Sequence, residues 1–540
     1  MDNQPTYDQL NQASQMPPNL PRGMMRGQQR KRGYNSRLQR IKNWSSQMNQ
    51  VGTLHIAWSM PRWLNDRAIW LYVGALFFIT VLYFKYSLPW YYMLSGVASI
   101  WVFFFYGRNL SETLSYRRIH SVKEFEKKIF AIAFWARMIW TLLIYYIFMQ
   151  IYGNAFGFEN ADAMFYHEAG EHLAFAIDNG NLHLFDELKK YAGEKIDFAD
   201  MGYAIYLGIV YFIADNIMLD GILFARVLKC ILSSLTVVFI YRLALRNFGS
   251  QVARISAIFC ALWPNFWYYC GCQLKEVEMV FLSVLFAEQA DQMLRSRQFS
   301  VWKILPILLS IGALFTIRTP LALVAILALL FSIVMSSSRV VTWGKRVIVG
   351  LVSLVLVVVT MGNRIQENVQ QLVTQQQSFQ QQGGMTWRAH RAQGNTYAQY
   401  ATAAVFAPLI FSIPFPTIVR TFNGQDMQQL LNGGNYIKNI LSILTILSMF
   451  VLLFSGSWRD HLIPLSFMLG YLVVLTMSNF AHSERFHQPA MPFELMFAAY
   501  GLSIVMSNKK YQRWFSYWFV FVFAVAVFWN WFKLAGRGLI

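Results

Sequence analysis

The chain has 540 residues, of which 56% are hydrophobic and only 14% are charged, against roughly 25% charged residues in an ordinary soluble domain. This composition excludes a water-soluble globular enzyme. The 46 Lys and Arg residues outnumber the 27 Asp and Glu residues, which gives a net charge of +19. Most of these charges lie between apolar segments and not on one basic domain. The pattern therefore favours a membrane protein over a nucleic-acid-binding protein.

Residues 1–66 form a basic tail rich in Gln, Asn and Pro, which we expect to be cytoplasmic. We expect no secretory signal peptide, because the first apolar run starts only near Ala68. Residues 38–63 carry apolar side chains at roughly helical spacing. This part of the tail is either an amphipathic helix on the inner leaflet or plain disorder.

Apolar runs long enough to cross a bilayer recur along the rest of the chain, and about 13 of them are predicted to span it. They cover residues 68–86, 89–106, 129–152, 222–245, 252–270, 277–293, 303–317, 320–336, 346–362, 437–456, 460–478, 489–507 and 514–533. The predicted fold class is an all-α polytopic membrane protein with two large extracytoplasmic loops.

The distribution of Lys and Arg predicts the orientation of these spans. With the N-terminus in the cytoplasm, the basic clusters fall in inner loops at nearly every turn, and the C-terminus lies outside. This holds only if the apolar stretch 201–219 does not span the membrane. The chain then divides into two additional helices within 67–128, a membrane core at 129–362, an outer loop at 363–436 and C-terminal helices at 437–540.

The two long outer loops differ in composition. The first, 153–221, is acidic, and the second contains a Gln-rich stretch at 370–382. The second loop also holds an apolar segment, 403–419, that three prolines interrupt. Because proline disrupts a helix, we expect this segment to be broken or re-entrant and packed against protein.

Asp162 lies just outside the third predicted span and at the start of a predicted helix. An acidic residue at the membrane surface is well placed to meet a lipid-borne substrate. Taken alone, the simpler interpretation is that Asp162 caps a helix that begins near Ala163, since Asp is a favoured N-cap residue.

The nearby cluster from His167 to His172 does not match a metalloprotease. Its two histidines are five residues apart, so on a helix their rings point to different faces, whereas zincins need them four apart. Ordinary helix-surface pairing, of Glu168 with His172 or of His167 with Glu171, is the favoured interpretation.

The order of several loose motifs resembles the polytopic GT-C glycosyltransferase superfamily, in particular bacterial members related to protein mannosyltransferases and aminoarabinose transferases. The resemblance covers roughly 137–507. The motifs are Asp162 with a following Tyr and Ala, Gly202-Tyr203, an Arg at the start of the next span, Phe248-Gly249, Trp263-Pro264 ahead of Glu276, Ile317-Arg-Thr-Pro320 and the stretch 483–492.

The resemblance implies an inverting transferase of the cell envelope that moves a sugar from a polyprenyl-phosphate donor to a lipid, glycan or protein acceptor at the outer face of a bacterial inner membrane. Its partners would be the donor, the acceptor and membrane lipids, without nucleic acid. By motif position Asp162 would be the base, and Glu168 or Glu276 would orient the acceptor or sugar. The cations expected to bind the donor phosphate are Arg485 first, then Arg318 and Lys275, with His482 and His487 beside Arg485; interfacial snorkelling is the alternative for the basic residues.

The sequence also departs from this family. Many relatives place two acidic residues side by side in the first outer loop, whereas Ala163 follows Asp162, and no Asp-x-Asp motif surrounds it. No metal ligand or cofactor is therefore required by the sequence, although a divalent metal is compatible with it. A transporter or flippase for a lipid-linked glycan, and a glycan polymerase or ligase, are the alternative functions; a transporter would show ionisable residues within the spans and two repeated halves.

Overall fold

The computed structural model describes most of the chain after the N-terminal tail. The described residues are 59–115, 118–157, 160–193, 198–296, 301–338, 340–341, 344, 347, 351, 390, 394–400, 403–420, 429–478, 480–507 and 509–540. The predictions for the tail before residue 59, for the span at 346–362 apart from two isolated positions, and for the Gln-rich stretch at 370–382 lie outside these residues.

Helices and short helical turns make up the regular structure of the described residues, beside one isolated bridge between Ser87 and Val419. The N-terminal helices are α3 (Arg62–Leu82), α4 (Trp90–Trp101), α5 (Gly107–Thr113) and α6 (Val122–Tyr152). A second group comprises α7 (Asn160–Asp178), α8 (Leu184–Ala192) and α9 (Phe198–Asn216). The central helices are α10 (Gly221–Phe248), α11 (Ser250–Leu262), α12 (Pro264–Cys270), α13 (Glu276–Arg295), α14 (Leu305–Ile317) and α15 (Thr319–Met335). The C-terminal part holds α18 (Ala403–Leu409), α20 (Asn432–Ser455), α21 (Leu462–Met477), α22 (Glu484–His487), α23 (Met491–Ser507) and α24 (Lys509–Ala535).

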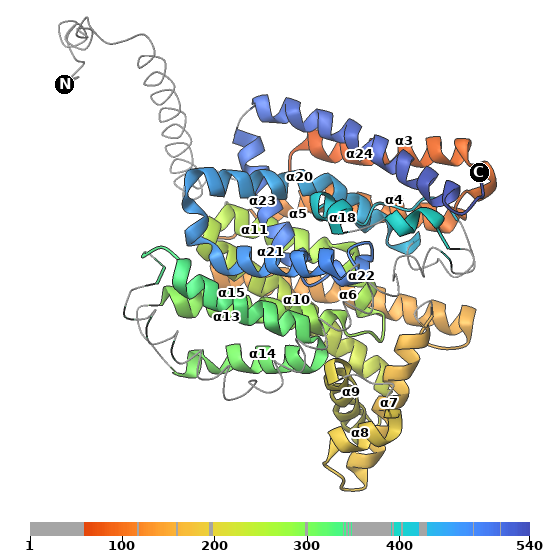
Figure 1. Ribbon diagram of the computed structural model, residues 1–540, viewed down its shortest axis with the longest axis vertical. Helices are drawn as coiled ribbons and strands as arrows, with labels where there is room; N and C mark the ends of the chain where they lie inside the picture. Colours follow the sequence, from red (N-terminus) through yellow and green to blue (C-terminus); the bar gives the residue numbers. More distant parts are fainter. Residues whose placement is uncertain are drawn as a thin grey trace, which may run out of the picture.

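The helices form one large body with a smaller lobe (Figure 1). Helix α10 packs against α6, α9, α11, α13 and α23, so it is central to the body. Helices α7, α8 and α9 pack on one another and project from the body as the lobe, while α3 and α24 lie side by side at the opposite end (Figure 1). The lobe corresponds to the predicted first outer loop, whose described residues are therefore mainly helical.

Five helices in the described part of the chain are long and apolar enough to cross a membrane, namely α3, α6, α10, α20 and the 511–535 part of α24. The all-helical fold of the described residues is thus confirmed, with several helices that could span a membrane. Each predicted span other than 346–362 overlaps a helix, but several of these helices have only 10–17 residues. The count of about 13 spans stays a prediction. Helix α9, whose non-spanning character the predicted orientation requires, is not among the five.

Helix α11 ends just before the Trp263-Pro264 motif, and its last carbonyl groups need hydrogen-bond donors from elsewhere. Proline cannot continue a helix, so the last carbonyl groups of α11 lack partners within it. The fully buried side chain of Arg137 on α6 supplies them: Nη2 donates to the carbonyl of Cys260 at 3.0 Å and Nη1 to that of Ala261 at 3.2 Å. Its Nε also donates to Ser233 on α10 at 2.8 Å. Arg137 therefore joins three helices of the body.

The apolar segment 403–419 is broken, as its prolines predicted. Helix α18 ends at Leu409, and the chain continues without regular structure while its apolar side chains stay buried. Side chains of neighbouring helices satisfy its backbone carbonyls: Lys438 donates at 2.8 Å, Asn439 at 2.5 and 3.3 Å, and Asn530 at 3.1 Å. Irregular backbone inside a membrane protein requires such partners, because lipid offers none.

The role of Arg137 can be tested by the substitution Arg137→Met. The change leaves a buried carbonyl without its donor, which costs about 1–3 kcal/mol, so we expect a lower apparent melting temperature of the purified protein. The control is Lys128→Met, which removes an exposed pair with Glu124 and should leave the melting temperature almost unchanged. Equal melting temperatures for the two variants would contradict the structural role of Arg137.

Candidate active site

Asp162 lies in the first turn of α7, because this helix begins at Asn160 and not near Ala163. The interpretation of Asp162 as the N-cap is therefore wrong. Its carboxylate Oδ2 instead accepts a hydrogen bond from Nη1 of Arg485 at 2.6 Å, and 56% of its side chain stays exposed. An acidic residue in the first turn is also favoured by the helix dipole. The carboxylate is thus held in place but remains open to solvent.

Arg485 joins three segments that are far apart in the sequence. It lies on the four-residue helix α22, and its Nε donates to Glu276 in the first turn of α13 while its Nη1 binds Asp162. Glu276 is almost fully buried, with 2% of its side chain exposed. Burial alone would lower the pKa of Arg485, but the carboxylates of Glu276 and Asp162 outweigh it and raise the pKa. The guanidinium is therefore a permanent cation.

Lys275, which precedes α13, forms a second pair in the same place. Its Nζ contacts the carboxylate of Asp200 and donates to the carbonyl of Ile317 at 3.0 Å, and the hydroxyl of Tyr166 donates to Asp200 at 3.1 Å. Burial lowers the pKa of Lys275 to about 7, and Arg318 contributes in the same direction. The contact with Asp200 acts the other way, since an adjacent carboxylate favours the ammonium form.

Arg318 lies at the junction between α14 and α15. Its guanidinium stacks over the ring of Phe486 at 4.7 Å from the centroid. Among the residues that the structure describes, no carboxylate lies within ion-pairing distance of Arg318. Its hydrogen-bond donors are therefore more available to an anion than those of Arg485.

These side chains line one pocket with a volume of about 300 Å³. Its lining residues are Asp162, Phe165, Tyr166, Asp200, Lys275, Glu276, Met279, Arg318, Arg485 and Phe486. Three carboxylates and three cations thus face a small volume together with aromatic rings. The pocket therefore offers both a hydrogen-bond acceptor for a hydroxyl group and a cationic surface for a phosphate.

The pocket contains five of the eight predicted site residues and excludes Glu168, His482 and His487. Glu168 is exposed on another face of α7, near Tyr191 of α8. His487 is fully buried, with one ring nitrogen against Nζ of Lys438 at 2.7 Å and the other against the carbonyl of Ala481 at 2.7 Å. Neither Glu168 nor His487 lines the pocket.

Asp200 and Tyr166 line the pocket, although no sequence pattern predicted a role in it for either residue. Asp200 is the acid in the first turn of α9, at the end of an apolar stretch, and 75 residues separate it from Lys275. The one available signal was its position just ahead of the Gly202-Tyr203 motif. That signal could not indicate which cation Asp200 meets.

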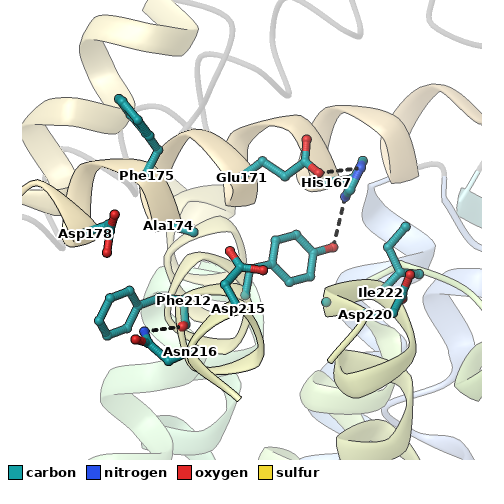
Figure 2. Close-up of a pocket in the computed structure, with 12 residues that line it drawn as sticks. His167, Glu171, Ala174, Phe175, Asp178, Phe212, Asp215, Asn216, Asp220 and Ile222 are labelled. Carbon is teal, nitrogen blue, oxygen red and sulfur yellow. Dashed lines mark hydrogen bonds and ion pairs between the residues drawn. The ribbon is translucent and has the colours of Figure 1, made fainter. Parts of the chain in front are cut away.

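A second hollow of about 530 Å³ lies between α7, α9 and the start of α10 (Figure 2). Four acidic residues, Glu171, Asp178, Asp215 and Asp220, line it, and none of its described lining residues is Lys or Arg. His167 contacts Glu171 at 3.3 Å, which confirms one of the two helix-surface pairs that the sequence allowed. The absence of a lining cation makes this hollow unsuited to a phosphate. In the described residues no three His, Cys, Asp or Glu side chains are grouped to hold a metal ion.

Comparison with known proteins gives one match. Residues 208–362 match the model of the dolichyl-phosphate-mannose-protein mannosyltransferase family, whereas no curated protein and no solved structure matches the chain. The match supports the resemblance to GT-C enzymes and points to a membrane glycosyltransferase of this type. It contains Lys275, Glu276 and Arg318. Asp162, Asp200 and Arg485 lie outside the matched residues, so their place in the site is supported by the geometry of the pocket alone.

The low pKa of Lys275 predicts a pH dependence of anion binding. Lys275 loses its proton as the pH rises through about 7, so its contribution to the binding of polyprenyl phosphate should be present at pH 6 and reduced at pH 8. In Asp200→Asn the missing carboxylate should shift this loss to lower pH.

The measurement is a binding titration with polyprenyl phosphate at several pH values, with Lys275→Arg as the control. Arginine stays charged throughout this range, so the control also reports the titration of the phosphate itself. If the wild type and Lys275→Arg have the same pH profile, Lys275 does not titrate in this range or does not bind the phosphate.

Proposed function

We propose that the protein is an inverting glycosyltransferase that moves a sugar from a polyprenyl-phosphate donor to a hydroxyl group of a lipid, glycan or protein at the outer face of the membrane. One observation carries this proposal: a single pocket combines the exposed carboxylate of Asp162 with the cations Lys275, Arg318 and Arg485. Transfer from a phosphate donor needs both kinds of group. The family match at 208–362 supports the same reaction class.

In the proposed reaction Asp162 accepts the proton of the acceptor hydroxyl group. At the same time the hydroxyl oxygen of the acceptor attacks the anomeric carbon of the donor sugar. The new glycosidic bond forms on the face opposite to the phosphate, the bond from the anomeric carbon to the phosphate oxygen breaks, and the configuration inverts. Polyprenyl phosphate leaves with the electron pair of that bond. A positioned base contributes typically 10²–10⁴-fold to such a step.

The departing phosphate gains negative charge, which the three cations would stabilise. Arg318 is the first contact that we propose, because its donors face no carboxylate among the described residues, whereas Arg485 and Lys275 are already paired. Charge-assisted hydrogen bonds from a guanidinium are stronger than neutral ones. The sequence predicted Arg485 as the first phosphate contact and Arg318 as the second, and we propose the reverse order. The proposed route uses side chains of the chain alone, so activity should survive treatment with a metal chelator.

We also propose an orientation, with the N-terminus in the cytoplasm, the C-terminus outside and the lobe of α7–α9 on the outer face of a bacterial inner membrane. The support is the basic character of the predicted inner loops. Several of their arginines make ion pairs within the body: Arg242 binds Glu126 through two contacts of 2.8 Å, and Arg246 binds Glu288 at 2.8 Å and Asp291 at 2.9 Å.

A flippase for a lipid-linked glycan is the second candidate function, because one observation favours it. Buried ion pairs lie within the helices, between Lys229 and Glu278 at 3.2 Å and between Lys438 and Glu494 at 3.7 Å. A flippase would move the donor lipid across vesicles in the absence of an acceptor. The glycosyltransferase proposal predicts instead that the sugar leaves the donor only when an acceptor is supplied.

The proposed base is tested by Asp162→Asn. We expect sugar transfer by the purified protein to fall about 100-fold or more, because the amide cannot take the hydroxyl proton, while yield and melting temperature stay unchanged. The matched control is Asp186→Asn, which alters an exposed acid of the same lobe. Full activity of Asp162→Asn would overturn the assignment.

The proposed phosphate contact is tested by Arg318→Ala. The loss of one charge-assisted contact should weaken competition by polyprenyl phosphate roughly tenfold, whereas competition by an uncharged polyprenol should not change. Arg318→Lys should keep part of the affinity, since it keeps the charge but loses the fork of donors. Equal competition in Arg318→Ala and the wild type would remove this residue from the donor site.

A further inference from the structure

The short helix α22 rests against a buried cluster of ionisable side chains that does not line the pocket. The side chain of Lys438 on α20 is 3% exposed and that of Glu494 on α23 is 4% exposed. Nζ of Lys438 lies 2.7 Å from Nδ1 of His487 and donates to the carbonyl of Ile413 at 2.8 Å. The cluster therefore ties α20 both to α22 and to the broken segment 403–419.

The hydrogen bonds fix the state of the His487 ring. Nε2 faces the carbonyl of Ala481 at 2.7 Å, and a carbonyl can only accept, so Nε2 carries the hydrogen. Nδ1 faces the ammonium of Lys438, which can only donate, so Nδ1 carries none. The ring is therefore neutral, and both of its nitrogens are used in holding α22.

The other end of α22 is held as well. Both carboxylate oxygens of Glu484 accept hydrogen bonds, one from Nδ2 of Asn265 at 2.6 Å and one from the hydroxyl of Tyr269 at 2.8 Å. Arg485 follows Glu484 directly and precedes His487 by two residues. The residue that binds Asp162 and Glu276 is therefore placed between two anchored side chains.

A buried lysine within a membrane protein carries a large desolvation cost, and apolar residues of the same volume would pack there without it. Lys438 does not line the pocket, so it does not touch a substrate there. We propose that Lys438 is a positioning residue for glycosyl transfer: acting through His487, it holds α22 so that the guanidinium of Arg485 is aligned with Asp162 and the donor phosphate. This inference rests on the proposed role of Arg485.

The test is a double-mutant cycle on polyprenyl-phosphate binding to the full-length purified protein. Lys438→Met is combined with Glu494→Gln so that no buried carboxylate is left without its cation. We expect this variant to bind polyprenyl phosphate roughly tenfold more weakly, as does Arg485→Ala. When the three substitutions are combined, the loss should be no larger than that of Arg485→Ala alone, because Lys438 acts only through Arg485.

A second pair of variants separates positioning from general stability. His487→Gln keeps an acceptor for Lys438 and a donor for Ala481, so binding should stay near that of the wild type, whereas His487→Leu removes both and should weaken it. The control for losing an ion pair within the body is Arg246→Met with Glu288→Gln, a partly buried pair at the far end of α10. It should leave the affinity for polyprenyl phosphate unchanged even where it lowers the melting temperature.

The outcomes separate this inference from the proposed function. If Arg485→Ala leaves binding unchanged, the phosphate-binding role of Arg485 fails and the positioning role fails with it. If Arg485→Ala weakens binding but the Lys438 variant does not, or the two losses multiply, only the positioning inference is overturned. Equal weakening by His487→Gln and His487→Leu would also overturn it.

Discussion

The candidate site depends on one interaction, the bridge that Arg485 makes between Glu276 and Asp162. Glu276 is buried, and a buried carboxylate without a partner would be strongly destabilising. The guanidinium that pairs with one of its oxygens comes from a residue 209 positions later in the chain and also reaches Asp162 on the lobe. The same contact that stabilises a buried charge therefore fixes the position of the exposed carboxylate relative to the body.

The electrostatic balance of the pocket follows from this bridge. Three carboxylates and three cations line it, but they are not paired one to one. Arg485 serves two carboxylates, Lys275 serves Asp200, and Arg318 stacks on Phe486 without a carboxylate in the described residues. Because Arg485 pairs with two carboxylates, Arg318 is left without a carboxylate partner among the described residues. A pocket with zero formal net charge can in this way still present a cation to an incoming phosphate.

Hydropathy predicted the position of most helices, because burial and lipid exposure both demand apolar residues. The third predicted span, 129–152, is the apolar part of α6, whose N-terminal end extends to Val122 and carries exposed charges. The prolines within 403–419 predicted a broken segment for the same local reason. Features that depend on a few neighbouring residues were readable from the sequence.

Features that depend on distant partners were not readable. The choice between capping and ion pairing for Asp162 depended on the start of α7 and on Arg485, 323 residues away. Adjacency along the chain misled the assignment of His487, because on a short helix the residue two positions after Arg485 can point to the opposite side. Its buried partner Lys438 lies on a separate helix, α20. The place of Asp200 in the pocket became evident only from the structure, where its carboxylate contacts Lys275.

The pocket residues share a position that explains why a mostly apolar bundle can hold such a site. The three carboxylates lie in the first turns of helices: Asp162 in α7, Asp200 in α9 and Glu276 in α13. Two of the cations immediately precede a helix, Lys275 before α13 and Arg318 before α15. The third cation, Arg485, lies on the short α22. Helix starts leave backbone N–H groups without partners and carry partial positive charge. Carboxylates are stable there, and the convergence of several helix starts adds to the field that favours a phosphate. A charged side chain inside a membrane helix carries a large desolvation cost, whereas a helix start can hold several charged groups close to solvent.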